Sequence, residues 1–336
     1  MEWFRENKEL VGYPMIDAVI PAHEKDKDTL DLCIKGIREN VKDIRRIIVV
    51  SKYKLTDEAE WYDEKDFPFS FEDVGKIVGF HNKTFNYYGG LIQTTSALVI
   101  PDLADNVLVC DADTIFLTPT TFVDENGIAH YNVSYDIPKN VTLHPYLEHM
   151  GKLIPGLDKQ SQYSGICHHM LIQKDVLAEM FKKVESIHFM PFWKADIWVT
   201  KQDYKSLNPK PPHANAPLLF TTYELYLNYV LKYHRDRVAI SPRKSILAYK
   251  GRMGVKNEVI HNIGSRTNLE GNVQIIPKEE EAKYDFPSFV ESCEHISQRC
   301  KELGWDAVTF QNHTRIGSDK HKQVCLDEVN EILESK

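Results

Sequence analysis

The sequence contains no CxxC pair, no long apolar run and no excess of basic residues. Its six cysteines are scattered, so we expect reduced thiols rather than a zinc ribbon or a dense disulfide scaffold. Lys and Arg number 41 against 49 Asp and Glu, which gives a net charge of −8. The chain therefore lacks the extended positive surface that a nucleic-acid backbone requires, and no nucleic-acid partner is expected.

Membrane segments are also missing from the sequence pattern. No stretch approaches the roughly 18 to 20 apolar residues that a membrane-spanning helix needs. The segment 1–14 carries charged residues throughout and lacks the apolar core of a signal peptide. We therefore expect a cytoplasmic protein without a membrane span.

Short apolar runs alternate with amphipathic segments in the first third of the chain. Strands are predicted at 16–21, 46–51, 76–80 and 106–110, and helices at 29–40 and 90–99. The continuous apolar runs are typical of strands that are buried on both faces of a parallel sheet. This order predicts an α/β fold of the Rossmann-like kind, with a mostly parallel central sheet flanked by helices.

The pattern changes after residue 117. Residues 118–160 are rich in Pro, His, Tyr and Asn and predict loops and short strands, which often carry ligand contacts. Further elements are predicted at 175–186 and 223–233 (helices) and at 237–240 (strand). Two amphipathic segments after residue 286 predict closing helices, and the absence of a repeat or linker favours a single domain.

The triplet Asp111-Ala112-Asp113 stands where the apolar run 106–110 ends. Ligands of open α/β sheets bind at the carboxyl ends of the strands. Alternate side chains of an extended segment share a face, so both carboxylates can face one hard cation while Ala112 turns away. Mn²⁺ or Mg²⁺ held there would offset the charge on a departing diphosphate. The alternative is a pair of polar residues at the boundary between a strand and a turn.

The order of motifs resembles that of the GT-A glycosyltransferases, which have a DxD motif and use nucleotide-sugars. Four segments carry the likeness together with the triplet: 19–26, 86–93, 164–177 and 220–230. They are similar to an uncharacterised branch of GT-A-like proteins over about residues 15 to 265. The resemblance implies a metal-dependent enzyme that moves a hexosyl or pentosyl unit from a UDP- or GDP-linked sugar to a hydroxyl acceptor, with a glycan expected and inversion left open.

The resemblance also divides the chain. It implies a GT-A-like catalytic domain over 1–275, with a nucleotide-binding half at 15–117 and an acceptor half at 118–275. Residues 276–336 are expected to form a helical extension packed on the same domain.

Candidate donor contacts lie on both sides of the triplet. The resemblance places Pro21, Ala22, His23 and Glu24 there, and it favours sugar contacts for the segment of His168 and His169. The residue pattern adds Lys52 after the second strand, Gly89, Gly90 and Gln93 before the triplet, Asp111, Ala112 and Asp113 in the triplet, and Lys250 in a local basic patch. Solvated loops explain the first group, and helix packing explains the glycines, about as well. We expect Gly89 and Gly90 to open a helix, where free amide N–H groups could face a ligand. Neighbours in a strand face opposite sides, so one histidine of the pair is expected in the core.

The resemblance also implies a base at a helix start and a histidine as third metal ligand. Glu224, early in the helix 223–233, is the expected base for the acceptor proton, although a capping carboxylate is an equal alternative. Asp196 lies among aromatic residues and is the competing base. His261 follows an apolar step and is a candidate third metal ligand.

Two other functions fit the same residues. Segment 107–117 also resembles the first motif of haloacid dehalogenase-type phosphatases, with Asp111 as nucleophile and Mg²⁺ as cofactor. That class requires a downstream acidic pair, which we do not find, and its motif normally opens the domain. The third hypothesis is a protein that binds a nucleotide-sugar or a glycan without turnover.

Overall fold

The computed structural model describes residues 14–79, 84–133, 145–206, 222–241, 243, 245–249, 260–262, 289–302 and 304–311. At its centre is a five-stranded sheet with the strand order β3-β2-β1-β4-β7. The strands are β1 (Ile16–Pro21), β2 (Ile44–Ser51), β3 (Glu60–Asp63), β4 (Asn106–Cys110) and β7 (His169–Gln173). β1 runs parallel to β2 and β4, and β2 runs parallel to β3, whereas β7 is antiparallel to β4. The predicted mostly parallel sheet is therefore confirmed.

Burial explains why the inner strands were readable from the sequence. Every residue from Ile16 to Ile20 and from Val107 to Cys110 is buried. Both strands have neighbours on two sides and helices on two faces, so their buried residues are apolar except for Asp17, which pairs with Arg45. The predicted strands 16–21 and 106–110 coincide with β1 and β4.

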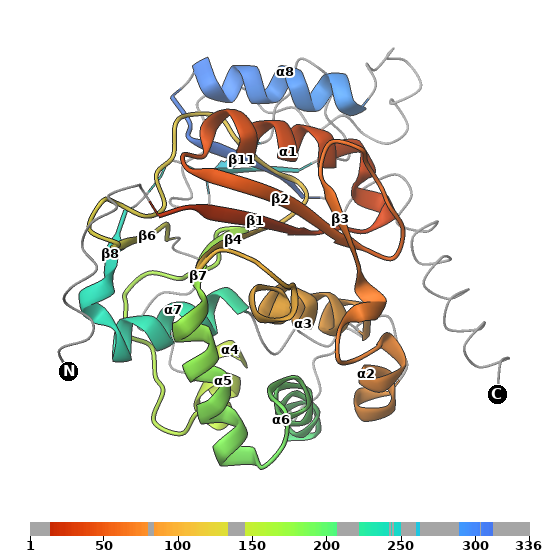
Figure 1. The fold of residues 1–336 in the computed structure, drawn as a ribbon, viewed down its shortest axis with the longest axis vertical. Coiled ribbons are helices and arrows are strands. Elements are labelled where there is room, and N and C mark those ends of the chain that lie inside the picture. The colour runs from red at the N-terminus through yellow and green to blue at the C-terminus, as the bar shows by residue number, and fades with distance from the viewer. Residues whose placement is uncertain are drawn as a thin grey trace, which may run out of the picture.

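Helices cover both faces of this sheet, in agreement with the prediction. One face carries α1 (Lys27–Asn40), and α8 (Phe289–Glu302) lies on the outer side of α1 (Figure 1). The other face carries α2 (Phe71–Val78), α3 (Thr84–Val99), α4 (Pro145–Leu153), α5 (Lys174–His188), α6 (Phe192–Ser206) and α7 (Thr222–Tyr233) (Figure 1). Among the described residues, no helix is both long and apolar enough to cross a membrane. The five described cysteines are buried, and none of them forms a disulfide bond.

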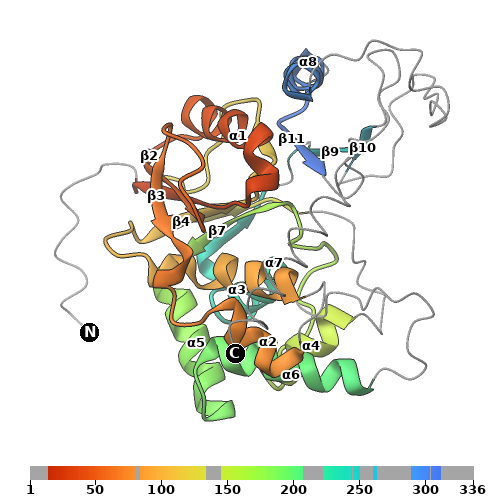
Figure 2. The ribbon, with the colours of Figure 1, turned by 90° about the vertical axis from the view of Figure 1, so that its right-hand side faces the viewer.

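A second sheet lies beside the first, below α8 (Figure 2). Its order is β10-β9-β11-β5, formed by β10 (Ile260–Asn262), β9 (Ser245–Tyr249), β11 (Ala307–Gln311) and β5 (Thr114–Phe116). Two further short strands, β6 (Ala129–Tyr131) and β8 (Val238–Ile240), pair in parallel. β5 follows the acidic triplet directly, and β11 pairs with both β5 and β9. The C-terminal segment therefore adds a strand next to the triplet as well as a helix.

Two sequence predictions differ from the structure, and a third is tested only in part. Residues 76–78 belong to α2 rather than to a strand, because Ser70 and Asp73 form a capping box that starts a helix there. The third parallel strand is instead β3, and the predicted loop region 118–160 contains α4. Of the two closing helices, the first is α8, while the second lies outside the described residues.

A glycine sets the spacing between α1 and β5. A Cβ atom added at Gly36 would lie 3.0 Å from both the backbone nitrogen and the backbone oxygen of Phe116. Backbone atoms cannot move aside as a flexible side chain can, so Gly36 permits the close contact of this helix with the strand that follows the triplet.

We predict that Gly36→Ala lowers the free energy of unfolding by about 1 kcal/mol or more, because overpacking outweighs the gain in helix propensity. Gly89→Ala is the matched control, since a Cβ atom there meets nothing within 4 Å. That variant should gain up to about 1 kcal/mol. Urea denaturation measures both, and equal stabilisation of the two variants would contradict the packing argument.

Candidate functional site

The acidic triplet lies where the direction of chain winding changes in the central sheet. β1 lies between β2 and β4. The helix α1, which follows β1, covers one face of the sheet, and α3, which precedes β4, covers the other (Figure 1). A crevice at the carboxyl ends of two such strands is where open α/β sheets bind ligands. The loop after β1 approaches the triplet, since the charges of Lys25 and Asp26 affect the pKa of Asp113.

Asp111 is held by donors from three separate segments. Its Oδ1 accepts hydrogen bonds from Gln93 Nε2 and from the Tyr223 hydroxyl, each at 2.7 Å. Its Oδ2 lies 2.9 Å from Nδ1 of His168. Burial favours a higher pKa for this carboxyl, but the hydrogen bonds that it accepts outweigh burial and lower the pKa. Asp111 is therefore an ionised and oriented carboxylate.

Asp113 differs from Asp111 in its surroundings. Within the described part of the chain, its carboxylate accepts no hydrogen bond and forms no ion pair. Burial and the negative charge of Asp111 raise its pKa from 3.8 to about 7. The two carboxylates of the triplet thus carry a like-charge repulsion that a cation would relieve. Ala112, between them, packs in the main core.

The structure separates the two adjacent histidines. His168 has a φ of 61°, in the left-handed region, and its backbone oxygen accepts a hydrogen bond of 2.9 Å from the backbone N–H of Asp111. His169 is buried in β7, with ring centroids 5.1 Å from Phe116 and 5.5 Å from Phe122. Burial lowers the pKa of His169 to about 3, so it is neutral. His168 therefore belongs to the site, and His169 lies in the core.

Glu224 is enclosed by its own partners. Its Oε1 lies 2.5 Å from Nζ of Lys159, and its Oε2 accepts hydrogen bonds from Ser164 Oγ at 2.8 Å and from the backbone N–H of Gly165 at 2.9 Å. The residue is 1% exposed. These contacts favour a positioning role over that of a base, because they leave neither oxygen free to accept a substrate proton. Glu224 fastens the segment leading to His168 onto the first turn of α7.

Gly165 shows how closely that segment is fastened. A Cβ atom at this position would lie 2.6 Å from the backbone oxygen of Tyr223 and 3.0 Å from Cβ of Leu227. Glycine is the residue that lets the chain pass this near to the start of α7.

Asp196, the competing base, lies inside the helical layer. It is 1% exposed in α6, and its Oδ1 lies 3.3 Å from Nε2 of His149 without hydrogen-bond geometry. Burial raises the pKa of Asp196 to about 8 and lowers that of His149 to about 4. Both groups are therefore neutral at pH 7. Asp196 has no contact with solvent through which it could serve a substrate hydroxyl.

The loop after β1 is ordered by its own hydrogen bonds. Ala22, which follows Pro21 at the end of β1, donates its N–H to the backbone oxygen of Val50 at 2.9 Å. His23 accepts from the backbone N–H of Lys25 at 3.2 Å and caps a short 3-10 helix, η1 (Glu24–Asp26). This places the predicted donor-binding loop at the carboxyl end of β1, next to the triplet.

The remaining predicted donor contacts lie after β2 and within α3. Lys52 follows β2, with its Nζ 5.3 Å from the centroid of the exposed Tyr53 ring. The prediction that Gly89 and Gly90 open a helix is wrong, because α3 already runs from Thr84 and their N–H groups are not those of a helix N-terminus.

Two predicted ligands cannot be placed by their side chains. Lys250 lies outside the described residues. The backbone of His261 is described, in β10 opposite Leu247 of β9, but its side chain is not.

Tyr223 is the site residue that the sequence analysis missed. Its ring is 4% exposed, yet its hydroxyl contacts both Asp111 and Gln93. One feature of the sequence points to Tyr223 as a site residue: it directly precedes the candidate base Glu224 at the predicted start of a helix. A tyrosine there is otherwise indistinguishable from a core aromatic residue.

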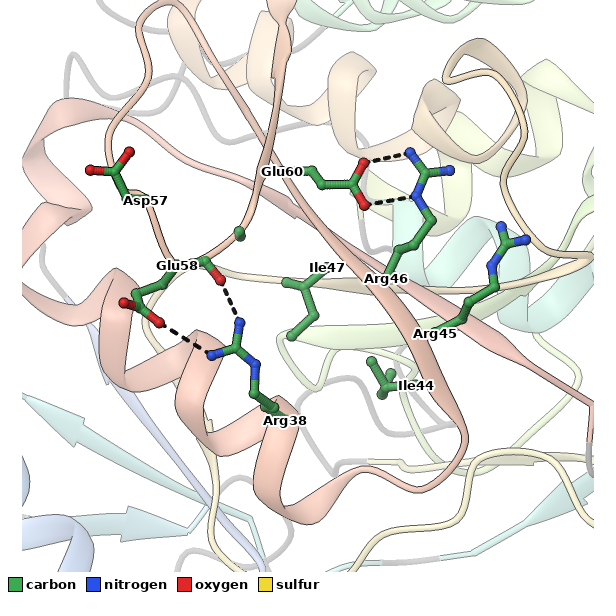
Figure 3. Close-up of a pocket in the computed structure, with 9 residues that line it drawn as sticks. Arg38, Ile44, Arg45, Arg46, Ile47, Asp57, Glu58 and Glu60 are labelled. Carbon is green, nitrogen blue, oxygen red and sulfur yellow. Dashed lines mark hydrogen bonds and ion pairs between the residues drawn. The ribbon is translucent and has the colours of Figure 1, made fainter.

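Two hollows lie elsewhere on the surface, away from the triplet. One, of about 470 Å³, lies at the amino end of β2, where Arg38 pairs with Glu58 and Arg46 pairs with Glu60 (Figure 3). The other, of about 340 Å³, lies between α1, β5 and α8. The first is at the wrong end of the strands for a ligand of an open α/β sheet, and its arginines are neutralised by carboxylates. The triplet lies at the switch point, the place between β1 and β4 where the direction of chain winding changes. It is the better candidate for the ligand-binding site.

A search of the described residues finds no group of three or more His, Cys, Asp or Glu side chains that could hold a metal ion alone. The triplet nevertheless offers two carboxylates, which are the ligands that Mg²⁺ and Mn²⁺ prefer. Mg²⁺ is commonly bound through one or two carboxylates together with substrate phosphates. The donor set therefore fits a cation that a diphosphate helps to hold.

Comparison with solved structures finds glycosyltransferases. The galactosyltransferase LgtC in complex with donor and acceptor sugar analogues is similar at 12% identity, with 69% of this chain and 75% of that chain covered and a TM-score of 0.39. The mannosyltransferase Ktr4p from S. cerevisiae is similar at 10% identity (57% and 64% covered, TM-score 0.38). Mouse xyloside xylosyltransferase 1 in its apo form is similar at 9% identity (68% and 84% covered, TM-score 0.32).

No family model matches the chain, and no curated protein matches it in sequence. At TM-scores below 0.5 the structural likeness carries no argument about chemistry. The case for a function therefore rests on the residues at the switch point.

We predict that Asp196→Asn becomes more stable relative to the wild type as the pH rises from about 4 to about 8. Below pH 4 the carboxyl is protonated in the folded and the unfolded chain alike. Between these values only the unfolded chain loses the proton, so wild-type stability falls by at most about 1.4 kcal/mol per pH unit. The variant lacks this loss.

Urea denaturation of both proteins at pH 4.5, 6 and 7.5 tests the assignment. If Asp196 were instead ionised and paired with a protonated His149, the variant would be less stable than the wild type near pH 7. The difference between the proteins would then not grow with pH.

Proposed function

We propose that this protein is a metal-dependent glycosyltransferase that moves a sugar from a nucleoside-diphosphate sugar to a hydroxyl acceptor such as a glycan. The single observation that carries this proposal is the pair Asp111 and Asp113 at the switch point between β1 and β4. One carboxylate is oriented by donors, and the other has no hydrogen bond or ion pair among the described residues. That is the arrangement expected of a cation site with an open side.

The cation supplies one thing when bound, which is positive charge beside the diphosphate as that group becomes the leaving group. Asp113, with Asp111 at its side, would hold Mn²⁺ or Mg²⁺. Burial and the negative charge of Asp111 raise the pKa of Asp113, and the positive charges of His168 and Lys25 offset them only in part. A bound cation favours the ionised form of both groups.

The ordered loop at His23 supports a place for the nucleoside. It leaves the carboxyl end of β1, and the charges of Lys25 and Asp26 in this loop act on Asp113. A diphosphate at the triplet would bring the attached base and ribose towards this loop. His168, whose Nδ1 lies 2.9 Å from Asp111 Oδ2, would lie near the transferred sugar or the acceptor.

The reaction that fits these positions is substitution at the anomeric carbon. The acceptor oxygen forms the new glycosidic bond, the bond from that carbon to the diphosphate oxygen breaks, and the nucleoside diphosphate leaves. The acceptor hydroxyl gives up its proton in the process. The buried contacts of Glu224 and Asp196 support neither as the group that takes it.

The phosphatase alternative is not favoured. Its nucleophile would be Asp111, with Mg²⁺ held jointly by a downstream acidic pair. The described residues contain no group of three or more His, Cys, Asp or Glu side chains in which Asp111 could meet such a pair. The nearby Asp26 is occupied in capping η1, so it does not supply the second acidic pair.

Thermal shift tests the proposal. UDP or GDP should raise the melting temperature by several degrees when Mn²⁺ is present and not when it is absent, because a ligand at 100 times its Kd stabilises the folded state by about 2.7 kcal/mol. Asp113→Asn should abolish this shift while retaining the fold. Asp57→Asn is the control, since Asp57 is exposed in the hollow at the other end of the strands. Stabilisation by UDP or GDP without Mn²⁺ would contradict the proposed cation site. An unchanged shift in the melting temperature of Asp113→Asn would also contradict it.

A further inference from the structure

Three side chains form a closed triangle of hydrogen bonds at the triplet. Gln93 Nε2 lies 2.7 Å from Asp111 Oδ1 and 2.7 Å from the Tyr223 hydroxyl, and that hydroxyl lies 2.7 Å from the same Oδ1. The three residues come from α3, the end of β4 and the first turn of α7. Two donors from different helices therefore converge on one carboxylate oxygen.

The triangle is built on supports that are themselves fixed. Directly before Tyr223, Thr222 Oγ1 lies 2.5 Å from Thr94 Oγ1, which joins the start of α7 to α3 next to Gln93. Directly after it, Glu224 holds the backbone N–H of Gly165. The first turn of α7 is thus fastened on both sides, so the tyrosine hydroxyl has little freedom to leave its position.

Core packing alone does not account for this arrangement. A buried tyrosine hydroxyl needs a partner, and a backbone group suffices, as at Tyr226, which accepts a 2.9 Å hydrogen bond from the N–H of Gln173. Tyr223 instead donates to a carboxylate at the ligand-binding edge, and Gln93 donates to the same oxygen. Two donors on Oδ1 and His168 on Oδ2 fix the carboxylate against rotation.

We infer that Tyr223 and Gln93 are positioning residues that orient the Asp111 carboxylate for a divalent cation shared with Asp113. The inference rests on the proposed function, and it assigns a role that depends on neither residue touching substrate. Hydrogen-bond partners behind a metal ligand keep that ligand in register, and their loss typically weakens metal binding by about 10- to 100-fold.

The test is a titration with Mn²⁺, followed by the electron paramagnetic resonance signal of the free ion, with the metal alone and in the presence of UDP or GDP. Tyr223→Phe should raise the Kd for Mn²⁺ about 10-fold or more, and Gln93→Leu should do the same. Tyr229→Phe is the matched control, because it lies on the same helix and its hydroxyl donates to Glu179 at 2.8 Å, away from the triplet. Its Kd should stay within about two-fold of the wild type.

The double variant of Tyr223 and Gln93 separates positioning from general damage. Both donors act on one oxygen, so the loss of affinity in the double variant should fall short of the product of the two single losses. A purely structural role would lower the melting temperature of Tyr223→Phe and leave the Kd of the folded protein unchanged.

The outcomes distinguish the two claims. Wild-type affinity for Mn²⁺ in both Tyr223→Phe and Gln93→Leu would overturn the positioning role and leave the proposed function standing. Absence of Mn²⁺ binding by the wild type under all three conditions would overturn the cation site and the positioning role together.

Discussion

The site depends on the orientation of one carboxylate, that of Asp111. It accepts hydrogen bonds from α3, from α7 and from His168 before β7, so these segments have to be packed before the triplet has its final geometry. The buried pair of Glu224 and Lys159 belongs to the same assembly, because it fastens the segment before His168 to α7. Removing one partner of such a buried pair is costly, since the other charge is left uncompensated. The helical layer therefore shapes the site at the edge of the sheet.

The ionisation of Asp113 depends on that of Asp111. Asp111 is kept ionised by its donors, and Asp113 beside it is pushed towards protonation by burial and by that charge. A divalent cation would relieve this repulsion, which links the electrostatics of the two carboxylates to the proposed chemistry.

Much of the fold could be predicted from local signals, whereas parts of the site could not. β1 and β4 were readable because they are buried on both faces, and the triplet was found from its place at the end of β4. The prediction of a strand at 76–80 is wrong because the capping box at Ser70, which is a local signal, starts a helix there. Tyr223 and the partner of Glu224 were beyond reach, since their contacts join residues 112 and 65 positions apart in the chain. Such pairings depend on tertiary packing rather than on spacing.

The central claim is that the triplet serves sugar transfer from a nucleoside-diphosphate sugar. Incubation of the protein with a panel of nucleotide-sugars and Mn²⁺, scoring release of the nucleoside diphosphate, tests it most directly. The account predicts slow release from at least one donor, lost on removal of the metal and in Asp113→Asn. Hydrolysis of a generic aryl phosphate, with every nucleotide-sugar left intact, would contradict it.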